Sequence, residues 1–272
     1  MPALFVVATP IGNLEDISLR ALRILREVRL IAAEDTRKTK RLLTTYDIKT
    51  PMTSYHQHNE GTKLDYILGC LEEGDVALVS EAGTPGMSDP GYELIVAASQ
   101  RGIPVVPVPG ASAIITALTI SGLATDRFTY LGFLPRRPNS RRSFLETVVN
   151  SHGTIIVLES PHRLLPALSD ILLVLGDRKI AVCRELTKLH EEVFRGRVSQ
   201  AIEHFTEPRG EFTLVIEGKE KRGEPLLTED IERQLRQMRL SEVTAREAIA
   251  RVAGETRLSR KELYQAWLKP LI

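Results

Sequence analysis

Short apolar runs of strand length alternate, in the first part of the chain, with longer segments whose apolar residues recur at helical spacing. The runs that predict buried strands are Leu4–Ala8, Leu30–Ala33, Val76–Ser80 and Val105–Val108. A helix with Asp16 or Ser18 as its cap is expected after the first run, and another over Tyr92–Arg101. Strands that alternate with helices favour an α/β fold with a largely parallel sheet covered by helices.

The alternation restarts after a predicted helix over Ala113–Leu123. Further strands are expected at Phe128–Phe133, Thr154–Leu158, Ile180–Cys183, Val193–Arg195 and Phe212–Glu217, with a helix over Arg163–Leu175. These strands contain more aromatic and threonine residues than the earlier ones. We therefore expect a mixed second sheet rather than a purely parallel one.

The end of the chain has a different pattern, with a polar linker predicted around residues 219–225 and short amphipathic helices after it. Thr244 with Glu247 and Ser259 with Glu262 have the spacing of capping boxes, and Gly254 is expected to end the first of these helices. The predicted organisation is an N-terminal α/β domain (1–115), a C-terminal α/β domain with a mixed sheet (116–220) and a helical appendage (226–272).

Bulk properties exclude several classes of protein. The 272 residues carry 36 basic and 35 acidic side chains, so no global charge attracts the chain to nucleic acid or membrane. Two cysteines cannot build a disulfide framework, and they favour a reducing compartment. The first apolar run has strand length and no basic residues before it, and no run is long enough to span a bilayer. A cytoplasmic enzyme is expected.

Three turns rich in glycine and proline each follow a predicted strand: Thr9–Asn13, Glu81–Gly91 and Pro109–Ala113. Ligands of α/β sheets bind at the carboxyl ends of strands, and glycine lets the backbone approach a ligand closely. The segment Ser80–Gly91, with three glycines and two prolines, is more than a connection requires. None of the three has a Walker A or GxGxxG pattern, which argues against a nucleoside triphosphate or NAD site.

Several polar side chains lie where they could take part in chemistry. Asp35 and Glu159 each follow a predicted strand. Either carboxylate could accept a proton, but Asp35 is equally suited to capping a helix. His56 and His58 lack a third ligand nearby, so no metal site is expected. A cluster of arginines is expected to clamp an RNA phosphate backbone, although a solvated loop is the alternative: Arg136, Arg137, Arg141 and Arg142.

Four motifs closely resemble one family. They are Val7–Leu14, Ala33–Arg37, Val79–Gly91 and Gly132–Pro135, and they occur in order along nearly the whole chain. They resemble the bacterial 16S rRNA (cytidine 2′-O) methyltransferases of the small-subunit methyltransferase I type, within the tetrapyrrole (corrin/porphyrin) methylase superfamily. One departure is Glu81, where that family more usually has aspartate. Backbone contacts are therefore the expected contribution there.

The resemblance implies two α/β domains with an S-adenosylmethionine cleft between them. It also implies a homodimer and 2′-O-methylation of a decoding-centre cytidine in 16S rRNA of the 30S subunit. The positions that match cofactor-binding residues are Pro10, Ser80, Glu81, Ala82, Met87, Ser112, Ala113, Leu158 and Thr213. Pro10 would line the cleft floor, and Leu158 and Thr213 would form a wall around the adenine.

Methyl transfer to a ribose hydroxyl is an in-line displacement in which the hydroxyl also loses a proton. The candidate proton acceptors are Glu34, Asp35, Asp89, Glu159 and His162, which the sequence does not rank. Asp35 or Glu159 is predicted, because both follow strands expected to face the cleft. Two other functions remain open. One is methylation of a tetrapyrrole on the same fold, against which the arginine cluster and the basic tail argue. The other is RNA or ribosome binding without catalysis.

Overall fold

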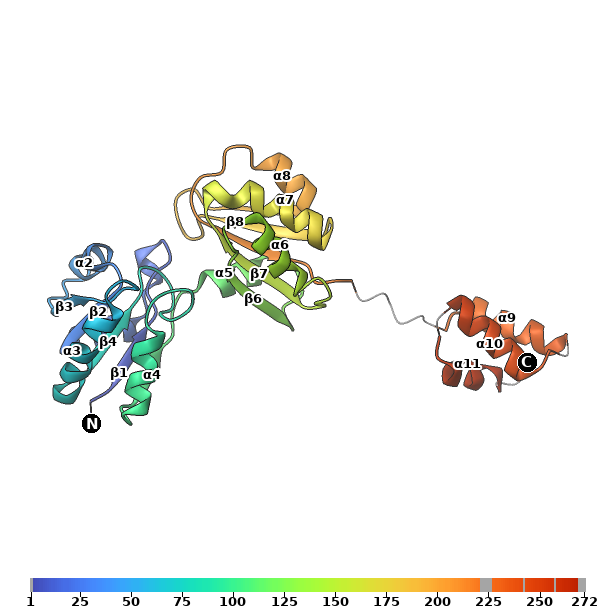
Figure 1. The fold of residues 1–272 in the computed structure, drawn as a ribbon, viewed down its shortest axis with the longest axis horizontal. Coiled ribbons are helices and arrows are strands. Elements are labelled where there is room, and N and C mark those ends of the chain that lie inside the picture. Colours follow the sequence, from blue (N-terminus) through green and yellow to red (C-terminus); the bar gives the residue numbers. More distant parts are fainter. Residues whose placement is uncertain (1, 221–226, 242, 257, 269–272) are drawn as a thin grey trace. The chain divides into compact units, whose positions relative to one another are not determined.

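The computed structural model describes residues 2–220, 227–241, 243–256 and 258–268. The chain divides into two compact units, unit 1 (Met1–Lys219) and unit 2 (Glu220–Ile272). Unit 1 holds two separate sheets accompanied by helices, and unit 2 is helical (Figure 1). Most of the predicted linker lies outside the described residues.

The first sheet has five parallel strands in the order β3-β2-β4-β1-β5. These are β1 (Leu4–Val7), β2 (Leu30–Ala33), β3 (Met52–Ser54), β4 (Val76–Val79) and β5 (Val105–Val108). The intervening segments are η1 (Leu14–Asp16), α1 (Leu19–Glu27), α2 (Thr36–Thr45), α3 (Glu60–Glu73) and α4 (Tyr92–Gln100). Because the parallel strands β4, β1 and β5 are neighbours, the three turns rich in glycine and proline lie together at the carboxyl end of the sheet.

Both faces of this sheet are buried, as a parallel sheet requires. Ile31 and Ala33 belong to a core that includes residues of α1 and α2. Leu30 and Ala32, one residue out of step, belong to the opposite core, with residues of α3 and α4. The continuous apolar run of β2 is therefore explained by two cores rather than one.

The second sheet is mixed and has the order β6-β7-β10-β8-β9. Only β6 and β7 pair in parallel, and the other neighbours are antiparallel. Its strands are β6 (Phe128–Phe133), β7 (Thr154–Glu159), β8 (Lys179–Arg184), β9 (Glu192–Arg197) and β10 (Phe212–Ile216). The helical segments are α5 (Ala113–Ile120), α6 (Pro138–Glu146), η2 (Pro161–Arg163), α7 (Leu164–Leu175) and α8 (Val198–His204).

The two faces of the second sheet have different partners. One face packs against α6, α7 and α8. The other packs against α5, and Ile11, from the turn after β1, joins the same core. A turn of the first sheet is thus anchored on the second sheet, and the two halves of unit 1 meet there.

Unit 2 consists of α9 (Glu229–Leu240), α10 (Ala245–Thr256) and α11 (Arg260–Trp267) around a small apolar core of its own. The Ser259–Glu262 capping box is present at the start of α11. The prediction that Gly254 ends a helix was wrong, because α10 continues through it to Thr256. In the part of the chain that the structure describes, no helix is long and apolar enough to cross a membrane.

The α/β class, the parallel first sheet, the mixed second sheet and the helical end are confirmed. The strands Leu30–Ala33, Val105–Val108 and Phe128–Phe133 have the predicted bounds. Strand β3 and helices α3 and α8 were not predicted, and α2 and α6 had been expected only as alternatives, a helix capped by Asp35 and a helix start at the arginine cluster.

Candidate active site

The loop of residues 80–91 has a backbone that only its glycines allow. Gly83, Gly86 and Gly91 have φ values of 78°, 81° and 132°. A Cβ on Gly91 would lie 2.7 Å from Cδ2 of Leu78, so a side chain there would collide with β4. The glycine content of this loop is therefore a requirement of its conformation.

The three turns contact one another at the carboxyl end of the first sheet. The N–H groups of Thr9 and Gly83 each donate to the other residue's carbonyl, at 2.8 and 3.0 Å. A Cβ on Gly110 would lie 3.1 Å from the Cβ of Ala8, which shows how closely the third turn approaches the first. Ser112 then caps α5 by accepting from the N–H of Ile115. Strand ends and caps thus build one continuous backbone surface.

A cavity of about 420 Å³, which we call the main cavity, lies between this surface and the second sheet. Seven of the nine predicted cofactor-binding residues line it: Glu81, Ala82, Met87, Ser112, Ala113, Leu158 and Thr213. Pro10 and Ser80 line a neighbouring cavity of about 330 Å³ instead. Phe212, which belongs to the strand predicted as a wall around the adenine, lines the main cavity, and so do Ile11 and Phe133, for which no role was predicted.

Glu159, at the end of β7, lines the main cavity and is buried. One carboxylate oxygen accepts from the N–H of Ser160 at 2.9 Å and lies 3.3 Å from Nε of Arg163. Oε2 has no hydrogen-bond partner among the described residues. Burial raises the pKa of Glu159, while the Ser160 N–H and the Arg163 charge act in the opposite direction. Glu159 stays a candidate for polar contact with a ligand.

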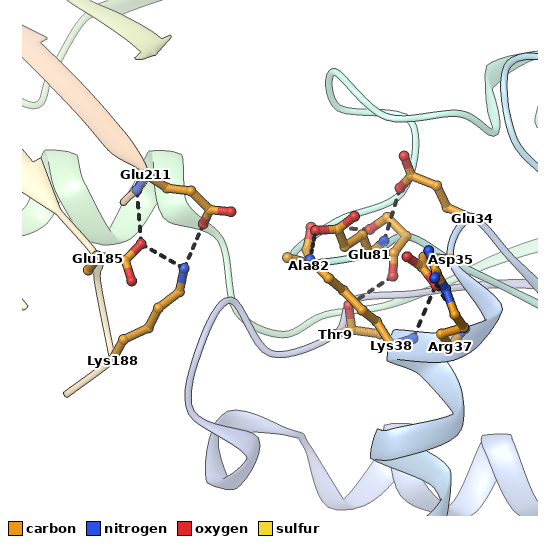
Figure 2. A network of polar contacts seen from close by, with 11 residues as sticks. Thr9, Glu34, Asp35, Arg37, Lys38, Glu81, Ala82, Glu185, Lys188 and Glu211 are labelled. Atoms are coloured by element: carbon orange, nitrogen blue, oxygen red, sulfur yellow. Dashed lines mark hydrogen bonds and ion pairs between the residues drawn. The ribbon is translucent and has the colours of Figure 1, made fainter. Parts of the chain in front are cut away.

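Asp35 has a different position. Its carboxylate caps α2 by accepting from the N–H groups of Arg37 and Lys38, at 2.8 and 3.2 Å (Figure 2). The hydrogen bond from the Lys38 N–H is the main cause that lowers the pKa of Asp35. Because Asp35 does not line the main cavity, the structure favours the capping role over that of proton acceptor.

The neighbouring carboxylates face the loop of residues 80–91. Glu34 accepts from the N–H of Glu81 at 3.0 Å, and the Glu81 side chain pairs with Lys38 of α2 (Figure 2). Asp89 lines the main cavity. Burial is the main cause that raises the pKa of Asp89 to about 7, and the Glu34 and Glu81 charges add to it against a hydrogen bond from Ser80.

A second polar network joins the turn after β8 to the start of β10. Lys188 donates to Glu185 at 2.9 Å and to Glu211 at 2.8 Å, and the Glu211 N–H donates to Glu185 at 2.9 Å (Figure 2). Glu185 and Thr187 have positive φ values of 49° and 66°. The Thr187 hydroxyl accepts from the N–H of Asn13 at 3.0 Å, which links this turn to the one after β1. Lys188 and Glu211 of this network line the neighbouring cavity.

The arginine cluster contains one residue that the prediction misplaced. Arg141 is buried, with a side chain 5% exposed, and its guanidinium lies 2.6 Å from the equally buried Asp170 of α7. It is therefore occupied inside the protein and does not present its charge to an RNA. Arg136 and Arg137 are exposed, and Arg142 is exposed although it also pairs with Asp170. A role in RNA binding stays a prediction for these three.

Comparisons with known proteins agree with this arrangement. A family model described as Tetrapyrrole (Corrin/Porphyrin) Methylases matches residues 3–202. A ribosomal RNA small subunit methyltransferase I of Synechocystis sp. is 47% identical over 274 residues, which cover 99% of this chain and 98% of that relative. A protein of the same name from Thermotoga maritima is 50% identical over 223 residues, which cover 81% of this chain and 100% of that relative.

A solved structure has the same fold at much lower identity. It is a uroporphyrin-III C-methyl transferase from Thermus thermophilus, complexed with S-adenosyl homocysteine. The two structures agree with a TM-score of 0.57 and 20% sequence identity, over 79% of this chain and 97% of that one.

Proposed function

The chain belongs to the tetrapyrrole (corrin/porphyrin) methylase family, and we propose that it methylates the ribose 2′-oxygen of a cytidine in 16S ribosomal RNA. Membership of this family makes it a methyltransferase that uses S-adenosylmethionine. The observation that carries the RNA assignment is the 47% identity to the Synechocystis ribosomal RNA methyltransferase across 99% of the chain. A match of that extent includes the cavity loops as well as the scaffold.

The main cavity fits S-adenosylmethionine. Its volume of about 420 Å³ lies within the usual range of small-molecule sites, which combine apolar walls with a few placed polar groups. Ile11 and Leu158 would contact the adenine, with Thr213 beside them. The backbone of the loop of residues 80–91 would hold the ribose, and Ser112 and Ala113 the methionine portion.

The reaction depends mainly on the relative position of its two reactants. S-adenosylmethionine supplies an electrophilic methyl group on a sulfonium. The attacking oxygen must lie in line with that methyl group, and holding both reactants in this geometry removes much of the barrier. The rigid loop of residues 80–91 and the wall from Leu158 to Ser160 are suited to that task, because the paired turns and the strand end that build them leave little freedom.

Local positive charge supports an RNA partner. Helix α2 carries four basic residues in its first two turns and no acidic ones: Arg37, Lys38, Lys40 and Arg41. Arg37 lines a surface cavity that also includes Glu34, and Arg41 lines the neighbouring cavity. Together with Arg136, Arg137 and Arg142, these cations would contact phosphates around the site. By family resemblance we also propose a homodimer, which sedimentation would test, and a cytoplasmic location with the ribosome.

Transfer of tritiated methyl groups to three acceptors tests the proposal. The acceptors are 30S subunits and free 16S rRNA, both from cells without this enzyme, and uroporphyrinogen. We expect label in one of the RNA acceptors, recovered after nuclease digestion as 2′-O-methylcytidine. Label in uroporphyrinogen alone would support the tetrapyrrole alternative and overturn the RNA assignment.

A further inference from the structure

A second, more polar cavity adjoins the main cavity. It measures about 520 Å³ and we call it the polar cavity. Its acidic and histidine lining residues are Glu34, His56, His58, Glu60, Asp89 and Glu93. Of all its lining residues, only Glu34 and Asp89 also line the main cavity. These two carboxylates therefore mark the place where a group in one cavity could reach a group in the other.

The position of Asp89 is fixed by an unusual backbone. Ser88 has a φ of 66°, a left-handed conformation that is strained for a residue with a side chain. The Ser88 hydroxyl lies 2.7 Å from the hydroxyl of Tyr130, on β6 of the second sheet. On the other side of Asp89, Gly91 has a φ of 132°, and a Cβ there would lie 2.7 Å from Cδ2 of Leu78. Strain of this kind persists where the surrounding structure holds a residue in place for function.

The two shared carboxylates differ in what they already contact. Glu34 accepts from the backbone N–H of Glu81 at 3.0 Å, so it serves to orient the loop. The Ser80 hydroxyl acts to lower the pKa of Asp89, and Asp89 has no ion pair with a basic side chain among the described residues. Of the two, Asp89 is the carboxylate that can take up a proton without releasing the loop.

We propose that the polar cavity binds the acceptor nucleoside and that Asp89 accepts the proton of its ribose hydroxyl during methyl transfer. The proposal rests on the function proposed above. In the step, the O–H bond breaks and its proton goes to the Asp89 carboxylate, while the oxygen forms a bond to the methyl carbon. The bond from that carbon to sulfur breaks, and its electron pair stays on sulfur as a neutral thioether.

The polar cavity has the chemistry that a cytidine requires. Its carboxylates can accept hydrogen bonds from the cytosine amino group, as acidic side chains do when they recognise this base. Nδ1 of His56 is buried and has no hydrogen-bond partner among the described residues. An unpaired buried nitrogen is costly, and a nucleoside hydroxyl or ring nitrogen would satisfy it.

The surroundings of Asp89 suit a base that works near neutral pH. Glu34 from the end of β2 and Glu81 from its own loop raise its pKa, and Tyr130 of β6 lies next to Ser88. His56, His58 and Glu60 before and within α3, and Glu93 of α4, face the same cavity. With a pKa of about 7, Asp89 is protonated and inactive at lower pH and ionised at higher pH. The methylation rate should therefore rise through about pH 7.

The same pKa has a consequence for stability. The pKa of Asp89 is about 7 in the folded chain, against an ordinary value of 3.8 for an aspartate, so the folded state binds more protons between these values. Stability contributed by this group is highest at low pH and falls as pH rises toward 7. Thermal unfolding of the protein without cofactor should include this contribution to the pH slope, and Asp89→Asn should reduce the slope between about pH 4 and 7.

The test compares Asp89→Asn with Glu159→Gln and with Asp65→Asn, a control on the exposed face of α3. Single-turnover methylation of 30S subunits is measured from pH 5.5 to 9, and binding of S-adenosylhomocysteine is measured by calorimetry. We expect Asp89→Asn to lower the rate at least about 100-fold and to remove the pH dependence, with affinity changed less than about threefold. Glu159→Gln and Asp65→Asn should keep the rise through pH 7.

The outcomes separate this proposal from the proposed function. If the unmodified enzyme labels no ribosomal RNA, the function itself is wrong. If it labels RNA and Asp89→Asn does so at a similar rate, or binds S-adenosylhomocysteine far more weakly, Asp89 is not the proton acceptor. A cooperative unfolding transition in Asp89→Asn shows that the variant is folded. His56→Ala should raise the KM for 30S subunits without changing cofactor affinity, and an unchanged KM would exclude the polar cavity as the acceptor site.

Discussion

At the scale of single residues, Arg141 and Arg137 illustrate how neighbouring arginines acquire different roles. They are four positions apart at the start of α6, yet Arg141 is buried against Asp170 while Arg137 is exposed. Although burial opposes it, hydrogen bonds from Arg142 and Arg141 hold the pKa of Asp170 below its usual value. The pair therefore connects α6 to α7 as charged groups.

We predict that Arg141→Ala lowers the free energy of unfolding by about 3–5 kcal/mol, because Asp170 would remain buried with its main partner removed. Denaturant unfolding measures this change. Arg137→Ala is the matched control and should shift the free energy by less than about 0.5 kcal/mol. Equal stability of the two variants would mean that the buried pair contributes nothing.

The sequence predicted which residues line the main cavity better than it predicted the contacts of each carboxylate, for a physical reason. Glycine and proline mark backbone shape directly, so the loop of residues 80–91 was recognised from its composition. Whether a carboxylate caps a helix or faces a cavity depends on its side-chain rotamer and on the residues that other elements bring to the cavity. Asp35 follows β2 and Asp89 lies in the loop after β4, and only the three-dimensional contacts distinguish the roles of the two carboxylates. Ile11 is an apolar residue within a turn, and this is the one feature of the sequence that could have predicted the contact between that turn and the second sheet.

At the scale of elements, amphipathic pattern and composition account for what was predicted and what was not. Helix α3 contains Gly61 and Gly69, which lower helix propensity, although Leu64, Ile67 and Leu71 are correctly spaced. Strand β3 has three residues and lies at the edge of the sheet, so only its pairing with β2 reveals it. Such elements depend on tertiary contacts rather than on local sequence.

Helix α2 leads to a prediction about RNA binding. The double variant Arg37→Ala/Arg41→Ala removes two exposed cations that line cavities beside the site. We expect it to raise the KM for 30S subunits about tenfold and to reduce the salt dependence of binding by a slope of about 2, without weakening cofactor binding.

The control for this experiment is Arg20→Ala/Arg23→Ala, on the exposed side of α1. It removes the same charge from a surface that lines none of the cavities described above. If both double variants change the KM and the salt slope equally, α2 is not a specific RNA contact and only net charge matters.

At the scale of the whole molecule, the two units have separate apolar cores. The predicted order of strands and helices was sufficient to assign the parallel and mixed sheets, because hydrophobic periodicity determines which faces are buried. The meeting of the two halves of unit 1 at Ile11 and α5 was not predictable in this way. It depends on contacts between residues far apart in the sequence.

The division into units predicts the effect of removing unit 2. The main cavity is lined only by residues of unit 1, and the Thermotoga relative matches this chain over its full length with 223 residues, close to the length of that unit. A chain ending at Lys219 should therefore fold cooperatively and bind S-adenosylhomocysteine within about threefold of the full chain, as calorimetry would measure. If unit 2 contributes to RNA binding, the KM for 30S subunits rises in the truncated chain while the single-turnover rate at saturating subunits is kept. A truncated chain that folds but has lost the cofactor would show that unit 2 completes the site.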